Sequence, residues 1–406
     1  MAGQKPMKAD HKDSQDENIN LLSIPGLSIR MDKKDDFIQL KATGGLHKAC
    51  APFLSRINER LKEERPALVT KDHVVASTWL PPIPSKAFKR LLIAETQIAL
   101  GRYIPETVSF EITRQCRCKC EHCVVSGGEG DLDIDTIKHA IDEVLDMGAM
   151  VIVFTEGDPM LREDIYELIK YVDKERAIVN MYTPGTEMTP DNARRLKEAG
   201  LHNLLVSLYS TNPAKHDSVR RLDGAFKMAT NAMRMGLEAG LLVTMATHVS
   251  PKNIEELPAM YELARQLGVH EFSLWESVPK KQGDAVIREE DRRKVLDMYH
   301  RINSTGKGPR IFANSYFEGK MLGCMAGQRW LHVCVDGAVK PCPYIPFSYG
   351  NITENSMKDI WDSIRKDKTF RGQRSTCLMQ EKQYLELVDR IPEGASKPYD
   401  RKLLDL

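Results

Sequence analysis

The chain has 406 residues, of which 42% are hydrophobic and 28% are charged. Its 58 basic and 57 acidic side chains leave a formal net charge of +1, so no charge excess favours nucleic acid or a membrane surface. The sequence contains no signal peptide and no apolar run of ~18 residues, the length of a transmembrane segment. These properties predict a cytoplasmic protein with one large domain and appendages, or with two to three domains.

The first part of the chain predicts a tail and a small accessory region. Residues 1–20 are polar and charged, which predicts a disordered tail. The stretch "LSIRMDKKDDFIQLKA" then predicts two short strands around a charged turn. Helical apolar spacing follows at 52–64 and 86–102, and the Pro-rich "LPPIP" breaks the pattern between them. We therefore expect an N-terminal accessory region over 21–104.

From residue 107 onward, short apolar strands alternate with amphipathic helices. In "DIDTIKHAIDEVLDMG", apolar residues share one face and Gly148 stands where a C-terminal cap belongs. Thr189-Pro190 has the form of an N-cap followed by proline at the first helical position. Six repeats predict a parallel sheet with right-handed crossovers and a ligand site at its carboxyl edge. The predicted strands are 107–113, 150–154, 177–181, 203–208, 241–247 and 270–275.

Four cysteines lie within the eight residues "CRCKCEHC" (116–123), three residues after the first predicted strand. A disulfide is disfavoured for cysteines this close in a cytosolic-type chain. Two alternatives remain: a structural zinc site, which usually joins two knuckles across a longer spacer, and an iron–sulfur cluster held by thiolates. Within the stretch, Cys116, Cys120 and Cys123 have the form C-x3-C-x2-C.

A second group of cysteines lies in "CMAGQRWLHVCVDGAVKPC" (324–342). Asp336-Gly337 between apolar flanks predicts a two-residue hairpin turn. That turn would pair position 334 with 339, and Cys334 would then face away from Cys342, unless a bulge reverses the order. We therefore leave Cys334 out of the predicted ligands. Cys50, in the N-terminal region, is predicted to be a buried apolar residue.

The C-x3-C-x2-C motif after the first strand of a βα series resembles the radical S-adenosylmethionine (SAM) superfamily. The resemblance implies an α/β fold, a partial (β/α)6 TIM-like barrel, over 105–305. It implies that Cys116, Cys120 and Cys123 bind a catalytic [4Fe-4S] cluster whose open iron chelates SAM, and that reduction cleaves SAM to methionine and a 5′-deoxyadenosyl radical. In this pattern Cys118 has no role and is expected to point away from the cluster, and His122 is expected to pack near the cofactor.

Later strand ends resemble the same superfamily. "FTEGDP" is similar to a Gly-Gly-Glu-Pro stretch, which places Asp158 at the SAM amino group and leaves Glu156 in place of a glycine. "VSLYSTNPAKHDSVRR" is similar to a Ser-Leu-Asp-Gly…His-Asp-x-x-Arg stretch, so Ser207 and Arg220 match positions that bind the SAM carboxylate. The alternatives are a solvated acidic turn for Asp158 and a small core residue for Ser207.

The stretch 324–361, with its "GNI" and "DIW", resembles the SPASM and Twitch extensions of radical SAM enzymes, which hold auxiliary [4Fe-4S] clusters. The resemblance implies such a domain over 306–406, with Cys324, Cys342 and Cys377 as ligands and a fourth ligand unassigned. The longer C-x2-C-x5-C-x3-C segment of full SPASM domains is absent from the sequence. One auxiliary cluster in a Twitch-like form is therefore expected.

Together these motifs predict a radical SAM enzyme that abstracts hydrogen from a substrate and receives electrons from ferredoxin or flavodoxin. Maturation of a peptide or protein is the predicted role, and modification of a small-molecule cofactor or lipid precursor is the alternative. A non-catalytic electron carrier or zinc protein is the rival from another class. It would have no need for Asp158, Ser207 or Arg220 at successive strand ends.

Overall fold

The computed structural model describes residues 18–34, 37–45, 47–48, 51, 54–55, 58, 64–99, 101–120, 122–123, 130–280, 283–305, 307–372, 374–391 and 398–401. The chain divides into two compact units, Met1–Pro66 and Ala67–Leu406. The predicted accessory region, 21–104, includes residues of both units. Among the described residues, no helix is long and apolar enough to cross a membrane.

The first unit contains an antiparallel sheet of three strands, β1 (Asn18–Ile24), β2 (Leu27–Lys34) and β3 (Phe37–Thr43), in that order. The two strands expected around the charged turn are β2 and β3, and their prediction is confirmed. Residues 18–20, which the sequence assigns to the tail, belong to β1. Most of the predicted helix 52–64, and Cys50, lie outside the described residues.

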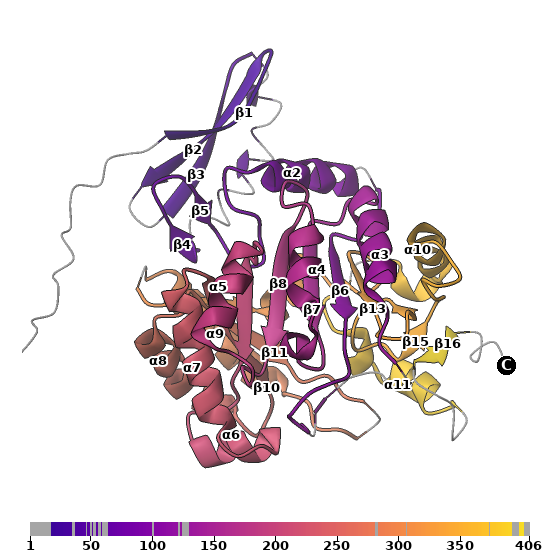
Figure 1. Ribbon diagram of the computed structural model, residues 1–406. Coiled ribbons are helices and arrows are strands. Elements are labelled where there is room, and N and C mark those ends of the chain that lie inside the picture. The colour runs from indigo at the N-terminus through magenta and orange to yellow at the C-terminus, as the bar shows by residue number, and fades with distance from the viewer. Residues whose placement is uncertain are drawn as a thin grey trace, which may run out of the picture. The chain divides into compact units, whose positions relative to one another are not determined.

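The second unit is built on a nine-stranded sheet with the order β12-β11-β10-β9-β8-β7-β6-β13-β14 (Figure 1). The six predicted strands are confirmed as β6 to β11, which pair in parallel. Two further parallel strands, β12 and β13, extend the sheet at its two sides. The strands are β6 (Thr107–Glu111), β7 (Val151–Thr155), β8 (Ile178–Thr183), β9 (Asn203–Ser207), β10 (Leu242–Val249), β11 (Glu271–Glu276), β12 (Arg310–Ala313), β13 (Trp330–Val333) and β14 (Val339–Lys340).

Helices connect these strands and begin where the sequence provides caps. The Thr189 side chain accepts a hydrogen bond from Asn192 N at 3.1 Å, which confirms the predicted N-cap. Asp133 caps the helix that follows β6 by accepting from Thr136 N at 2.9 Å. The helices of this unit are α2 (Lys86–Ala99), α3 (Ile134–Asp146), α4 (Ile165–Tyr171), α5 (Pro190–Glu198), α6 (Pro213–Arg220), α7 (Ala225–Glu238), α8 (Leu257–Leu267), α9 (Glu289–Asn303), α10 (Met357–Lys366) and α11 (Lys382–Val388).

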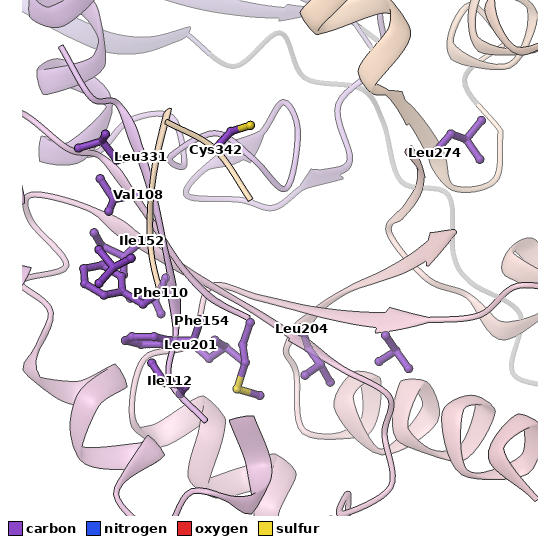
Figure 2. Packing of buried hydrophobic residues seen from close by; sticks show 14 of the residues in the cluster. Val108, Phe110, Ile112, Ile152, Phe154, Leu201, Leu204, Leu274, Leu331 and Cys342 are labelled. Atoms are coloured by element: carbon purple, nitrogen blue, oxygen red, sulfur yellow. The ribbon is translucent and has the colours of Figure 1, made fainter. Parts of the chain in front are cut away.

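One face of the sheet is apolar and packs against the helices. Phe110, Phe154 and Leu204 lie on this face and are at most 1% exposed (Figure 2). Each such side chain contributes about 1.5–3 kcal/mol through burial. The strands were recognisable in the sequence as short apolar runs between helices, as is typical of buried parallel strands.

The opposite face of the sheet is polar, and a segment before α2 closes its amino end. Thr78 Oγ1 donates to Glu271 Oε1 at 2.6 Å, and Arg310 donates to Glu271 Oε2 at 3.0 Å. The Trp79 ring lies 5.4 Å from the Trp275 ring. Because this end of the barrel is filled, the carboxyl ends of the strands are left for a ligand.

The hairpin formed by β13 and β14 has a register different from the predicted one. His332 pairs with Lys340 and Val333 with Val339, and Cys334 N donates to Ala338 O at 2.8 Å. Three residues, 335–337, therefore form the turn, and Gly337 adopts the left-handed conformation (φ 86°) that such a turn requires. The prediction of a two-residue turn was wrong by one residue. The argument that Cys334 faces away from Cys342, which depended on that turn, was therefore also wrong.

Candidate active site

A cavity of about 250 Å³ lies at the carboxyl ends of the parallel strands. Residues from the loops after β6, β7, β8, β9 and β11 line it, together with residues of β10, of β13 and of the segment after β14. The lining side chains include polar, ionisable and aromatic groups: Ser109, Cys116, Cys118, Cys120, His122, Cys123, Glu156, Tyr182, Ser207, Tyr209, Arg220, His248, Trp275, Lys280, Trp330 and Tyr344.

All four cysteines of the first group line this cavity. Cys118 is buried and its thiol forms hydrogen bonds with those of Cys116 and Cys120, so it lies toward the predicted cluster ligands, whereas the sequence led us to expect it to point away from the cluster. Hydrogen bonding with Cys118 lowers the pKa of Cys116. A hydrogen bond with Cys118 and the charge of the Arg220 guanidinium lower the pKa of Cys120 to about 6, although desolvation acts in the opposite direction. Since a thiolate is the form that binds metal, the lowered pKa values of Cys116 and Cys120 favour binding of a soft metal ion by this loop.

Arg220 is placed beside the cysteine loop from the last turn of α6 and is only 6% exposed. It donates from Nη1 to Cys120 Sγ at 3.4 Å and from Nη2 to the Ser207 carbonyl at 3.2 Å. Its Nε has no hydrogen-bond partner among the described residues. A buried guanidinium with an unused N–H, facing a cavity, suits a carboxylate ligand. The structure thus brings Ser207 and Arg220 together, as their predicted shared role requires.

Asp158 does not line the cavity. Its carboxylate is fully buried and accepts hydrogen bonds from Thr183 Oγ1 at 2.9 Å and from Thr186 Oγ1 at 2.8 Å. Burial raises its pKa. The carboxylate ties the loop after β7 to the loop after β8, and its contact with SAM stays a prediction. The acidic side chain from this loop that lines the cavity is Glu156.

Two histidines and a tyrosine form an aromatic group at the cavity rim. The His122 ring stacks on His248 at 4.9 Å and meets the edge of Tyr209 at 4.7 Å. Desolvation, and then the nearby positive charges, lower the pKa of His122 to about 3. The ring is therefore neutral at pH 7 and packs against its neighbours.

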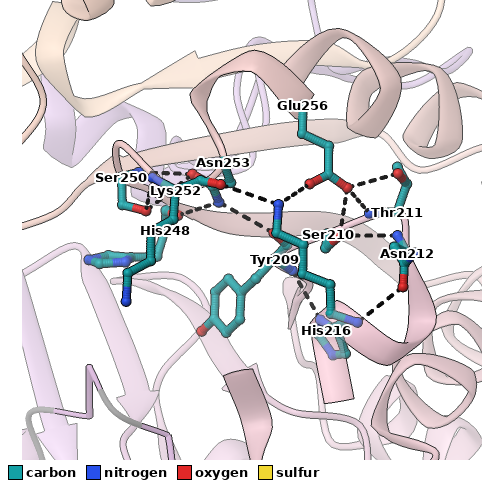
Figure 3. A network of polar contacts seen from close by, with 11 residues as sticks. Tyr209, Ser210, Thr211, Asn212, His216, His248, Ser250, Lys252, Asn253 and Glu256 are labelled. Atoms are coloured by element: carbon teal, nitrogen blue, oxygen red, sulfur yellow. Dashed lines mark hydrogen bonds and ion pairs between the residues drawn. The ribbon is translucent and has the colours of Figure 1, made fainter. Parts of the chain in front are cut away.

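A polar network holds the loops after β9 and β10 in place (Figure 3). The Glu256 carboxylate accepts from Ser210 Oγ at 2.6 Å, from Thr211 N at 2.6 Å and from Lys215 Nζ at 2.7 Å. Asn253 Nδ2 donates to the His248 carbonyl at 2.9 Å. These contacts lie immediately beside the predicted SAM residues and fix the backbone that carries them.

The second group of cysteines is much more deeply buried. Desolvation, followed by the charge of Cys324, raises the pKa of Cys342 to about 12. Desolvation and the charges of Cys324 and Cys342 together raise the pKa of Cys377. Cys324 N also donates to the Arg374 carbonyl at 2.8 Å, which joins this segment to the one carrying Cys377. The three predicted thiols thus interact with one another in a dry environment.

Comparison with known proteins agrees with this arrangement. Residues 110–264 match the model of the radical SAM superfamily, and residues 324–384 match SPASM, an iron–sulfur cluster-binding domain. The protein is a radical SAM enzyme. It carries a C-terminal SPASM-type domain, and its cofactors are SAM and [4Fe-4S] clusters, one of them auxiliary. The non-catalytic rival is therefore excluded.

Several relatives of this radical SAM enzyme are curated or solved. The AdoMet-dependent heme synthase of Methanosarcina barkeri is 27% identical over 308 residues, covering 67% of this chain and 88% of the relative. The subtilosin biosynthesis protein AlbA of Bacillus subtilis is 28% identical over 280 residues, covering 66% and 62%. The structure of Streptococcus suis SuiB bound to precursor peptide SuiA matches with a TM-score of 0.59 and 14% identity, covering 78% and 80%. This last match confirms the fold.

Sequence reasoning did not find the aromatic walls of the radical SAM cavity. Trp275, Trp330, Tyr182 and Tyr344 line it. Trp330 reaches the cavity because β13 pairs in parallel with β6, more than 200 residues earlier in the chain. No local pattern signals a pairing between such distant strands. The position of Trp275 at the carboxyl end of a predicted strand was the one available signal.

Proposed function

We propose that this radical SAM enzyme modifies a peptide or protein, with a side chain of the substrate entering the cavity at the carboxyl ends of the strands. The aromatic wall of this cavity carries the proposal. Trp275, Trp330 and Tyr344 line the same cavity as the cysteine loop, and their rings offer apolar contact area that excludes water.

The residues present fit a [4Fe-4S] cluster and SAM. Cys116, Cys120 and Cys123 supply the thiolate donors that such a cluster takes. When bound, the cluster and SAM supply one-electron cleavage of SAM, which gives a radical able to take hydrogen from an unactivated carbon. Arg220, whose Nη2 is held by the Ser207 carbonyl and whose Nε hydrogen is unused, would hold the SAM carboxylate, with the Ser207 hydroxyl as a second donor.

Lys280, His122 and Asp158 position the loops and rings around the site where the cluster and SAM would bind. Lys280 Nζ donates to the Cys123 carbonyl at 2.6 Å and so joins the loop after β11 to the cysteine loop. The neutral His122 ring packs beside the cofactor position and offers no charge that competes with Arg220. Asp158 acts through Thr183 and Thr186, whose loop it holds.

For the auxiliary cluster we propose Cys324, Cys342 and Cys377 as ligands. Thiols in a dry environment favour the neutral form, as their raised pKa values indicate. Binding to iron removes that penalty because the metal takes up the thiolate charge. The site would hold the substrate or accept an electron from it.

Support for a peptide substrate comes from two sides. The matching SuiB structure contains a precursor peptide, and AlbA takes part in bacteriocin biosynthesis. In this chain, the first unit is a separate antiparallel sheet, and a peptide can bind to a sheet edge as an added strand. We propose that this unit binds the leader part of the substrate.

The second candidate is a small molecule. The heme synthase relative favours it, since its match also covers two thirds of this chain. A tetrapyrrole side chain could enter the same aromatic cavity. Under either proposal a ferredoxin or flavodoxin would supply electrons. The protein would act in the cytoplasm, where the eight free cysteines of the described residues stay reduced.

The test is to coexpress the protein with the small peptides encoded beside its gene and to examine them by mass spectrometry. We expect a peptide that loses hydrogen atoms or gains a cross-link only when Cys116, Cys120 and Cys123 are intact. In a parallel assay, iron-coproporphyrin is incubated with the reduced enzyme and SAM. Unmodified peptides together with a consumed porphyrin would overturn the peptide proposal and establish the second candidate.

A further inference from the structure

A buried group of metal-binding side chains lies where β6 and β13 end, and none of its members is among the predicted cluster ligands. Glu111 stands at the end of β6, and His332 and Cys334 stand on and just after β13. One ligand atom from each lies within 4.8 Å of the other two, and all three residues are buried. Glu156 joins them from the loop after β7, with 9% of its side chain exposed.

The distances between these side chains differ from those of hydrogen bonds. His332 Nε2 lies 3.4 Å from Glu156 Oε2 and 4.0 Å from Glu111 Oε2. A direct N–H···O bond would measure about 2.7–3.2 Å. Two ligands on a tetrahedral ion at about 2.1 Å, however, lie roughly 3.4 Å apart. The 3.4 Å separation equals such an edge, and the 4.0 Å separation is about 0.6 Å longer.

The other nitrogen of the imidazole is already held. His332 Nδ1 lies 2.9 Å from Ser109 Oγ, which also accepts from Trp330 Nε1 at 2.9 Å. A hydrogen on Nδ1, donated to Ser109, leaves the lone pair of Nε2 directed at the two carboxylates. Histidines that bind metal are oriented in this way by a second partner on the opposite nitrogen.

Two buried polar atoms of the group also lack hydrogen bonds. Neither His332 Nε2 nor Glu156 Oε2 has a hydrogen-bond partner among the described residues, although the His332 side chain is fully buried. Such atoms are destabilising if nothing satisfies them. Glu156 moreover has a φ of 60°, a left-handed conformation that is unfavourable for a non-glycine residue. A bound cation would offset both costs.

We propose that Glu111, Glu156, His332 and Cys334 form a mononuclear site for a divalent transition metal of the zinc type. One imidazole, one thiolate and two carboxylates are ligands that Zn²⁺ accepts in tetrahedral geometry. The site also accounts for the acid at position 156, where the superfamily pattern has glycine. It is independent of the iron–sulfur ligands and of the identity of the substrate.

The test uses the full-length, cluster-loaded protein, freed of loose metal on a chelating resin and then exposed to Zn²⁺. We expect one zinc per chain in addition to the cluster iron. X-ray absorption at the zinc edge should show one sulfur and three nitrogen or oxygen neighbours. This measurement on the unaltered protein does not depend on whether any variant folds.

Variants then assign the ligands. His332→Gln and Cys334→Ser should lower zinc content at least tenfold with unchanged cluster iron, whereas His139→Gln, on the exposed surface of α3, should retain it. Zinc below a tenth of an equivalent in the unaltered protein would overturn the proposal. So would zinc with three or four sulfur neighbours, which would mean occupation of the cysteine clusters, or zinc retained in folded His332→Gln.

Discussion

The two groups of cysteines differ in what surrounds them. Those of the first group line an open cavity, and Arg220 and Cys118 lower the pKa of Cys120 to about 6. In the C-terminal group, burial dominates and raises the pKa of Cys342 to about 12. The contrast indicates two tasks: an iron–sulfur cluster open to a second ligand in the first region, and an enclosed cluster in the other. Four predictions test this contrast.

The largest effect is expected from replacing the first group. A Cys116/Cys120/Cys123→Ala variant should lose about four of eight irons per chain and form no detectable 5′-deoxyadenosine from SAM after reduction. The reason is that the enclosed group has no open cavity for SAM. Iron analysis and chromatography of the nucleoside provide the measurement. Deoxyadenosine from this variant would show that SAM binds elsewhere.

The opposite replacement should separate SAM cleavage from substrate turnover. In Cys342→Ala or Cys377→Ala, we expect about four irons to be lost while deoxyadenosine still forms without substrate, because the cavity cysteines are untouched. The same assays apply, with circular dichroism as a check of folding. A folded variant that keeps all its iron would remove these residues from the ligand set.

Arg220 should determine the affinity for SAM and not the presence of iron. In Arg220→Gln, the loss of a charge-assisted hydrogen bond to a carboxylate should weaken SAM binding about 10–100-fold, with unchanged iron content. Equilibrium binding of SAM measures the effect. Arg221→Gln is the matched control, because its side chain is exposed, and a similar loss in both variants would contradict the assigned role.

The smallest effect concerns the polar network beside the first site. Hydrogen bonds from Lys215, Ser210 and Thr211 lower the pKa of Glu256 to about 2, against a desolvation effect that raises it. Because the folded pKa lies below the usual value of 4.5, the stabilisation is present at neutral pH and is lost as the pH falls from about 5 toward 2.

Glu256→Gln should therefore lower the free energy of unfolding by about 2–3 kcal/mol at pH 7. The deficit should shrink below about pH 5. Urea titrations at several pH values measure it, with Glu255→Gln as the control, since that exposed residue forms only a surface ion pair with Lys294. A deficit that is independent of pH would mean that the charge of Glu256 plays no part.

Much of the fold was predictable because its signals are local. The strands β6 to β11 are short apolar runs separated by amphipathic helices, and Thr189 and Gly148 mark helix ends in the sequence itself. The cluster loop was predicted from the resemblance of the Cys116, Cys120 and Cys123 spacing to the superfamily pattern, which is also local. These features depend on residues a few positions apart, which a single sequence displays directly.

Other features depend on contacts between distant segments. The pairing of β13 with β6 brings Trp330 to the cavity and His332 beside Ser109, and no residue pattern near either strand indicates this pairing. The one-residue difference in the hairpin turn changed the facing of Cys334. The loop after β7 directs Asp158 inward to Thr183 and leaves Glu156 at the cavity, a choice made by backbone conformation and not by residue type.

The most direct test of the central claim is electron paramagnetic resonance of the Cys324/Cys342/Cys377→Ala variant after reduction, with and without SAM. Only the first cluster is expected in this variant. The account predicts the signal of one reduced [4Fe-4S] cluster whose g-values shift when SAM is added, because SAM binds at its open iron beside Arg220. A cluster signal that SAM leaves unchanged would contradict the assignment of Cys116, Cys120 and Cys123 to the SAM-binding cluster.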